Sequence, residues 1–390
     1  MKKQFTIPCI YLLLLCTVFS CKKDLQVYNA ESTASTSADQ VATRVSAVFI
    51  SGSDSVFCLN ALTGATIWTY KVPAPIISAP CIKNDVFFFN VNDSLYALNI
   101  NNGSLLWKSY TNYFSNGALC VANDKVYIHT LPALLCFNAK NGKGLWHAKI
   151  SVIDGYETCS SPTVVNNTVY VGGNLDHSVS AFDATTGTIK WRFDGFGHMA
   201  TKFIVISSPC VIGNKVFCTH INGRTFALDT LTGSVIWANA DPGHSITGDG
   251  SYTASAGKIY QTASVLICRD QATGNKLWAR DLSTRDCFVD DTVVYTATNY
   301  STEPKLFALS AGNGNILWSY DLPDNCVTPV KAGNVLYYTS SSSGILYALD
   351  ASSRNILWSK NINRFFTMQS IVVALTPDNI IYPAVSGMTQ

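Results

Sequence analysis

An eleven-residue phrase that ends in tryptophan occurs eight times in this chain of 390 residues. Its clearest copies read AFDATTGTIKW (181–191) and ALDTLTGSVIW (227–237). The other copies occupy 58–68, 97–107, 136–146, 268–278, 308–318 and 348–358. The chain has eight tryptophans, one at the end of each copy, spaced by 39 to 46 residues. Because a period near forty with glycine turns is typical of propeller blades, we predict an all-β fold, an eight-bladed β-propeller.

Each repeat divides into four short strands. In the copy that ends at Trp191, the strand-like runs are 160–165, 168–173, 178–183 and 188–193. Turns of two to four residues separate them, which is the pattern of a β-meander. Hydrophobic residues make up 47% of the chain and charged residues only 13%, about half the charged share of an average soluble protein. This composition favours many half-buried and buried strands.

The two ends of the propeller are expected to meet in the first blade. The segment 47–53 reads as the second strand of the Trp68 blade, whereas 370–379 and 380–385 read as a further first and second strand. We predict that the C-terminus supplies the innermost strand of the Trp68 blade, because this pairing closes the ring and removes free sheet edges. One of the two second-strand candidates must then lie outside the regular pattern.

The residues of the phrase have structural explanations. The small residue, alanine or cysteine, is predicted to lie in the third strand, where blades press together. The aspartate or asparagine that follows can accept hydrogen bonds from turn amides, and the glycine permits the positive φ of the hairpin turn. The tryptophan is expected to lie across the interface with the next blade and to donate its indole N–H to a backbone carbonyl.

These structural residues can be named in nearly every copy. They are the tryptophans Trp68, Trp107, Trp146, Trp191, Trp237, Trp278, Trp318 and Trp358, and the glycines Gly64, Gly103, Gly142, Gly187, Gly233, Gly274 and Gly314. The eighth copy has Arg354 where the others have glycine. Its turn is therefore expected to be strained or to be shifted to Asn355.

The pattern A-x-D-x-x-T-G-x-x-x-W, complete at 181–191 and 227–237, resembles the tryptophan-docking motif of the quinoprotein family, the propellers of pyrroloquinoline-quinone (PQQ) type. The resemblance covers residues 46–390 and implies the propeller fold. The family includes quinone-dependent alcohol dehydrogenases. It also includes a non-catalytic branch with the propeller lipoprotein of the outer-membrane β-barrel assembly machinery, which this chain resembles. Family membership therefore leaves the function open.

The enzymatic alternative is weighed on the cysteines. The dehydrogenases of the family use a vicinal disulfide against the quinone, and this chain has no adjacent cysteines. We expect no catalytic residue, no metal and no cofactor. The alternative is a quinoprotein-type oxidoreductase or cofactor-binding protein, with PQQ and Ca²⁺ in the central funnel. The ten cysteines after Cys21 fall largely at equivalent repeat positions, where they are too far apart to bridge and are expected to be small buried residues.

The N-terminus predicts export and a lipid anchor. Residues 1–20 carry two lysines and the short apolar run 10–19, which is typical of a signal peptide, and VFSC (18–21) resembles a bacterial lipoprotein signal with Cys21 as the acylated residue. The alternative is an ordinary secretory signal cleaved near Ser20. Residues 21–45 are expected to form the lipidated cysteine and a flexible tether, followed by the propeller over 46–390. This predicts an outer-membrane lipoprotein of the bacterial cell envelope, facing the periplasm or the exterior.

Long loops between blades are the candidate binding surface, because loops on a rigid scaffold carry function. They span 151–158, 194–203 and 240–252. The candidate binding rim comprises Asp154, Tyr156, Glu157, His198, Lys202, His244, Asp249 and Tyr252. With a formal charge of +2 and no long basic run, the chain offers no footprint for nucleic acid. We predict a monomeric propeller body that acts as a binding or assembly scaffold for a protein, peptide or glycan partner.

Overall fold

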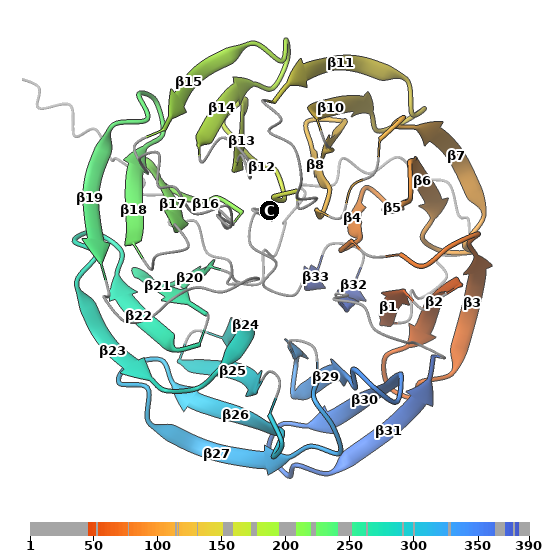
Figure 1. Cartoon of the computed structure of the whole chain (residues 1–390). Coiled ribbons are helices and arrows are strands. Elements are labelled where there is room, and N and C mark those ends of the chain that lie inside the picture. Colours follow the sequence, from red (N-terminus) through yellow and green to blue (C-terminus); the bar gives the residue numbers. More distant parts are fainter. Residues whose placement is uncertain are drawn as a thin grey trace, which may run out of the picture.

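The computed structural model describes residues 46–381 apart from short gaps. The gaps are 52–53, 77, 114, 116, 131, 151–158, 173–177, 195–207, 220–223, 241–251, 263, 291, 299–300, 327–328, 363–370 and 377–378. Eight antiparallel sheets stand around a central axis like the blades of a propeller (Figure 1). The prediction of an all-β, eight-bladed propeller is confirmed. No helix in the described part of the chain is long and apolar enough to cross a membrane.

Blades are numbered here by the order of their tryptophans. Blade 1 contains β1 (Ala47–Ser51), β2 (Ser55–Asn60), β3 (Thr66–Lys71), β32 (Val372–Thr376) and β33 (Asn379–Ile381). Blade 2 contains β4 (Cys81–Lys83), β5 (Val86–Val91), β6 (Ser94–Asn99) and β7 (Leu105–Tyr110). Blade 3 contains β8 (Cys120–Ala122), β9 (Lys125–His129), β10 (Ala133–Asn138) and β11 (Gly144–Lys149). Blade 4 contains β12 (Thr163–Val165), β13 (Thr168–Gly172), β14 (Val179–Asp183) and β15 (Ile189–Phe193).

The second half of the ring repeats this arrangement. Blade 5 contains β16 (Cys210–Ile212), β17 (Lys215–Thr219), β18 (Arg224–Asp229) and β19 (Val235–Ala240). Blade 6 contains β20 (Tyr252–Ser255), β21 (Lys258–Gln261), β22 (Leu266–Asp270) and β23 (Lys276–Arg280). Blade 7 contains β24 (Thr284–Asp290), β25 (Val293–Thr298), β26 (Lys305–Ser310) and β27 (Ile316–Asp321). Blade 8 contains β28 (Val330–Ala332), β29 (Val335–Thr339), β30 (Ile345–Asp350) and β31 (Ile356–Asn361).

Both ends of the described chain build blade 1. Strand β1 pairs antiparallel with β32, with Ala47 opposite Ala374 and Phe49 opposite Val372, so the C-terminal segment supplies an inner strand as predicted. Strand β33 pairs on the other side of β32 and extends the sheet to five strands, in the order β3-β2-β1-β32-β33. The second-strand candidate outside the regular pattern is therefore the C-terminal one. Because β1 and β32 are far apart in sequence, this pairing closes the ring.

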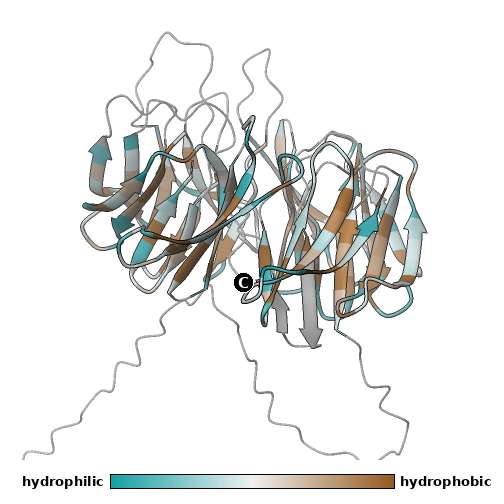
Figure 2. Cartoon of the chain, turned by 90° about the horizontal axis from the view of Figure 1, so that it is seen from below, coloured by the Kyte–Doolittle hydropathy of each residue, from teal (hydrophilic) through white to brown (hydrophobic). Residues whose placement is uncertain are grey.

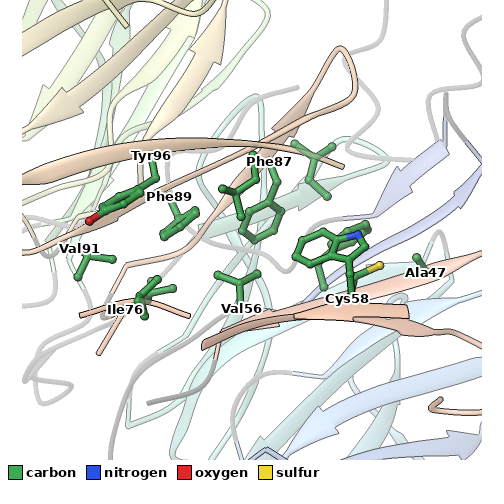
Figure 3. Close-up of a cluster of buried hydrophobic side chains, with 13 residues drawn as sticks. Ala47, Val56, Cys58, Ile76, Phe87, Phe89, Val91 and Tyr96 are labelled. Carbon is green, nitrogen blue, oxygen red and sulfur yellow. The ribbon is translucent and has the colours of Figure 1, made fainter. Parts of the chain in front are cut away.

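The hydrophobic core lies between the blades. Eight clusters of buried side chains fill the eight interfaces between neighbouring sheets. Figure 3 shows the first of them, in which Val56 and Cys58 of blade 1 meet Phe87 and Phe89 of blade 2. Hydrophobic residues follow the strands, while many of the connecting turns are hydrophilic (Figure 2). Each blade thus depends on both neighbours to bury its faces, which is the physical basis of the closed ring.

Candidate functional site

The repeated tryptophans join neighbouring blades through hydrogen bonds. The indole N–H of Trp191 donates to the carbonyl oxygen of Thr230 in the next blade at 2.9 Å, and that of Trp358 donates to Ala61 across the ring closure at 3.0 Å. Equivalent bonds are made by Trp68, Trp107, Trp146, Trp237 and Trp278. The predicted interblade role of these residues is confirmed.

The glycine of each phrase is required by both conformation and space. Gly233 has a φ of +71°, and a Cβ placed on it would lie only 2.6 Å from Cε3 of Trp191. A side chain at this position would be strained and would also push the indole of the preceding blade away. The glycine and the tryptophan are therefore two halves of one interblade contact.

The aspartate of the phrase caps the turn, as predicted. Asp183 accepts hydrogen bonds from the backbone N–H groups of Thr185 and Thr186 at 2.9 and 3.0 Å. The hydrogen bond from Thr186 lowers the pKa of the Asp183 carboxyl, with further contributions from Thr185 and Lys190. The charged form of Asp183 is thus the one that the turn stabilises.

Arg354 occupies the glycine position of blade 8 without a shift of the turn. It has a φ of +63°, and its N–H donates to the carbonyl of Asp350 at 2.8 Å, as the N–H of Gly187 does to that of Asp183. Of the two alternatives from the sequence, strain at Arg354 is confirmed. By the repeat geometry this turn faces Trp318, the one tryptophan for which no interblade indole bond is found among the described residues.

A second aromatic completes each contact, which the sequence reasoning missed. An aromatic ring from the second strand of every blade lies 5.8 to 6.1 Å from the tryptophan ring of that blade. Where the ring is a tyrosine, its hydroxyl can donate to the same carbonyl as the indole: Tyr170 does so to Thr230 at 3.2 Å and Tyr337 to Ala61 at 3.0 Å. The signal was an aromatic at a constant place in each second strand.

Most of the described cysteines lie in the core. None of the ten forms a disulfide within the described residues, and eight of them are buried. Burial raises the pKa of Cys58, Cys120 and Cys268 to about 12, which keeps these groups as neutral thiols at physiological pH. The prediction that they serve as small core residues is confirmed.

Most of the predicted rim lies outside the described residues. This applies to Asp154, Tyr156, Glu157, His198, Lys202, His244 and Asp249, so the rim stays a prediction. Cys21 also lies outside them. The expectation for Tyr252 was wrong, because this residue begins strand β20 and is buried, with its hydroxyl donating to Oγ1 of Thr225 at 3.3 Å.

A buried polar network connects blades 2, 3 and 4. Ser160, which follows the loop 151–158, donates from Oγ to the carbonyl of Gly172 at 2.9 Å. Its own carbonyl lies 3.1 Å from Nδ1 of the buried His129 in blade 3. Ser115 donates to the carbonyl of His129 at 2.6 Å and accepts from Asn90 in blade 2 through its own carbonyl at 2.9 Å. Blades 2 to 4 are thus connected by hydrogen bonds as well as by apolar packing.

An open groove of about 740 Å³ lies between the outer parts of blades 2 and 3, a volume typical of ligand sites. We call it the blade 2–3 groove. One wall is formed by 109–113 at the end of β7, and the other by Leu145, His147 and Lys149 of β11. Leu135 and Phe137 of β10 line it from the core side.

One small residue, Ser109, contributes to the open space of the groove. Two residues after the tryptophan, blades 1 and 4 have Tyr70 and Phe193, which pack against aromatic rings of the next blade at 5.5 to 6.5 Å. Blade 2 has Ser109 at this position, and its hydroxyl donates to the carbonyl of Gly142 at 2.7 Å. A serine leaves unfilled the space that these aromatic rings occupy between blades 1 and 2 and between blades 4 and 5.

Comparison with known proteins identifies the family. A family model described as the outer membrane protein assembly factor BamB matches three overlapping segments, 26–155, 96–286 and 262–383. The chain belongs to the BamB-like family of β-propeller repeat proteins. The quinoprotein-type resemblance of its tryptophan motif is thereby confirmed.

The relatives that the chain matches are distant in sequence. The chain is similar to tetrathionate hydrolase of Acidithiobacillus ferrooxidans, with 23% identity over 45% of this chain and 38% of the relative. It is also similar to BamB of Kangiella koreensis, with 23% identity over 31% of this chain and 32% of the relative. The matches thus span less than half of these relatives. The crystal structure of BamB from Moraxella catarrhalis shares the fold, with a TM-score of 0.64, 16% identity and coverage of 78% of this chain and 95% of that one.

Proposed function

We propose that this protein is a propeller scaffold of the bacterial cell envelope, held at the outer membrane by a lipid on Cys21, and that it binds a protein or other ligand partner. The observation that carries the proposal is a closed, internally bonded ring with an open groove at one interface. The description of its family as an outer membrane assembly factor supports a role in the envelope.

A rigid ring is well suited to recognition. The indole bonds, the glycine contacts and the pairing of β1 with β32 hold every blade against two neighbours. Binding to a surface that is already ordered avoids the entropic cost of ordering loops and side chains. The repeated positions are engaged in these contacts, so specificity is assigned to positions that differ between blades.

Site-specific photo-crosslinking in native membranes tests the binding role. A photoactivatable residue at Tyr113, which lines the groove, is expected to give a discrete adduct. The matched control is Leu231, which is 84% exposed in a turn of blade 5 and is expected to give none. Identical adducts at both positions, or no adduct at any exposed position of the groove and rim, would contradict the scaffold role.

The membrane anchor is tested separately. The Cys21→Ser variant is expected to move from the membrane fraction to the soluble extracytoplasmic fraction, because stable anchoring requires the acyl chains. A Cys58→Ser variant is the control, since Cys58 is a buried thiol of β2. Membrane retention of the Cys21→Ser variant would refute lipidation as the anchor.

We propose no cofactor for this scaffold, and the PQQ alternative has its own test. Within the described residues, no group of three or more His, Cys, Asp and Glu side chains could hold a metal ion, and the sequence has no adjacent cysteines. Titration of the full chain with PQQ and Ca²⁺, followed by absorbance and native mass spectrometry, is expected to show no stoichiometric complex. A tight complex with dye-linked alcohol oxidation would instead assign the protein to the catalytic members.

A further inference from the structure

Beside the groove, the end of β7 differs from the other blades at the third residue after the tryptophan. Three residues after the tryptophan, the described blades have the polar or charged side chains Lys71, Lys149, Asp194, Asp281, Asp321 and Asn361, or Ala240. Blade 2 has Tyr110, whose side chain is 65% exposed, and Tyr113 follows it at 43%. Tyr113 lines the groove, and an exposed aromatic residue beside an open groove is the kind of surface that binds partners.

Tyr110 is held in place by its neighbours. The Nζ atom of Lys108 lies 4.9 Å from the ring centroid of Tyr110 and 5.1 Å from that of Tyr96. Such cation–π contacts restrict the orientation of an exposed ring. Because Tyr96 packs against blade 1, these contacts place the Tyr110 ring on the face of β7 that looks toward blade 1 and not on the face that lines the groove.

The opposite wall combines apolar and polar side chains with one lysine. Leu145, His147 and Lys149 alternate along β11 on the face that looks toward blade 2, since His147 pairs with Leu135 and Lys149 with Ala133. The lining residues of the groove include no aspartate and no glutamate. The groove thus complements a partner that carries both apolar side chains and carboxylates.

The dimensions suit an extended peptide. Strand β11 has six residues, which corresponds to about 17 Å at the rise of an extended chain. Asn112 is the single carboxamide among the lining residues, and Leu135, Phe137, Leu145 and Trp146 make much of the surface apolar. A glycan would require more carboxylate and carboxamide partners for its hydroxyl groups than this lining supplies.

We propose that the blade 2–3 groove binds a short extended peptide segment of a partner protein, with aliphatic side chains against Leu135 and Leu145 and a carboxylate paired with Lys149. This inference rests on the proposed scaffold function and names the chemistry of its partner. It also assigns specificity to Ser109, because a large residue there would fill space that receives the peptide.

Selection from a random dodecapeptide phage library on the immobilised full chain tests the proposal. Enriched peptides are expected to combine aspartate or glutamate with aliphatic residues. The Ser109→Tyr variant copies Tyr70 of blade 1 into the groove and is expected to abolish binding. Lys149→Glu is expected to weaken binding about tenfold or more, the scale of a hydrogen bond to a charged group. Lys71→Glu changes an exposed lysine at the equivalent position of blade 1 and is expected to leave binding unchanged.

Each remaining outcome would overturn the peptide site. The proposal would be refuted if no peptide were enriched, if the enriched peptides lacked carboxylates, or if the Ser109→Tyr variant bound them equally well. It would also be refuted if a glycan array bound the parent chain and not this variant. Leu145→Ala keeps the test valid if Ser109→Tyr fails to fold, because Leu145 lines the groove and is 43% exposed, so its truncation is expected to weaken binding without unfolding the chain. If crosslinking at the rim persists while all groove variants bind normally, the groove proposal fails and the scaffold function stands.

Discussion

Replacing Arg354 with glycine is expected to stabilise the propeller. Arg354 is the non-glycine residue at a turn position where seven other blades have glycine with φ between +69° and +74°. A left-handed backbone costs an L-residue about 1–2 kcal/mol, and this cost disappears in Arg354→Gly. The gain is offset by about 0.4–1 kcal/mol because glycine increases the entropy of the unfolded chain.

A further contribution comes from the facing tryptophan. At the other turns, a Cβ would lie 2.5 to 2.6 Å from the indole of the preceding blade. Removing the Cβ of Arg354 allows the Trp318 indole to take the position that the other indoles have. The interblade hydrogen bond that it can then make contributes about 0.5–1.5 kcal/mol. We therefore expect the free energy of unfolding to rise by about 1–2 kcal/mol in total.

Urea unfolding followed by circular dichroism measures the change, with the slope against urea checked for constancy. The control is Arg354→Ala, which removes the charge and the long side chain but keeps the Cβ. Its stability is expected to stay within about 0.5 kcal/mol of the parent, as for ordinary surface changes. The reverse substitution, Gly187→Ala, is expected to destabilise. If Arg354→Ala stabilises as much as Arg354→Gly, the strain argument is refuted.

Three further predictions concern acid, thiols and ring closure. The turn aspartates have pKa values lowered below 3.8 by hydrogen bonds, so their stabilisation is complete above this pH and is lost as pH falls through the lowered values. Replacing them by asparagine, the residue that blades 1 to 3 already have, at Asp183, Asp229, Asp270 and Asp350 should lower the stability at neutral pH and weaken its dependence on pH in acid, as urea unfolding at several pH values would show. The eight buried thiols should react with iodoacetamide only after unfolding, as peptide mapping would show; rapid labelling of the native chain would contradict this. Deleting 371–390 should lower the melting temperature far more than deleting 379–390, because only the first removes the strand paired with β1.

The fold could be predicted because the eleven-residue phrase occurs eight times, and each copy marks the equivalent position in one blade. The tryptophan, glycine and aspartate positions placed every third and fourth strand correctly. Each of these residues is needed locally, because the aspartate and glycine form the turn and the tryptophan contacts the next blade. The first strands have no such marker, and in the second strands the marker is the single aromatic that the sequence reasoning missed. The role of β33 could not be predicted, because its sequence fits either an inner or an outer position in the sheet. Only its pairing with a distant strand determines which position it takes.

The candidate site was less predictable, and Ser109 shows why. A serine in an outer strand has no pattern of its own, and its effect appears only when it is compared with Tyr70 and Phe193 at the equivalent position. The groove therefore depends on a difference in side-chain volume across an interface, which no spacing rule detects. Tyr252 was misplaced for a local reason: it directly follows a polar, glycine-rich segment, and the strand begins at the residue itself.

Comparing equivalent positions of the eight blades distinguishes two kinds of residue that differ from the other blades, those that serve binding and those that only cost stability. Ser109→Tyr and Arg354→Gly both return a blade to a residue that equivalent blades already contain, so each has a structural precedent within the same chain. The two departures have opposite physical consequences: Arg354 adds strain at a turn, whereas Ser109 opens space at an interface. Restoring the repeat at Arg354 should therefore change stability and leave peptide binding intact, whereas restoring it at Ser109 should remove binding while the ring stays folded. Loss of binding in both variants would show that the groove depends on the ring as a whole and not on Ser109.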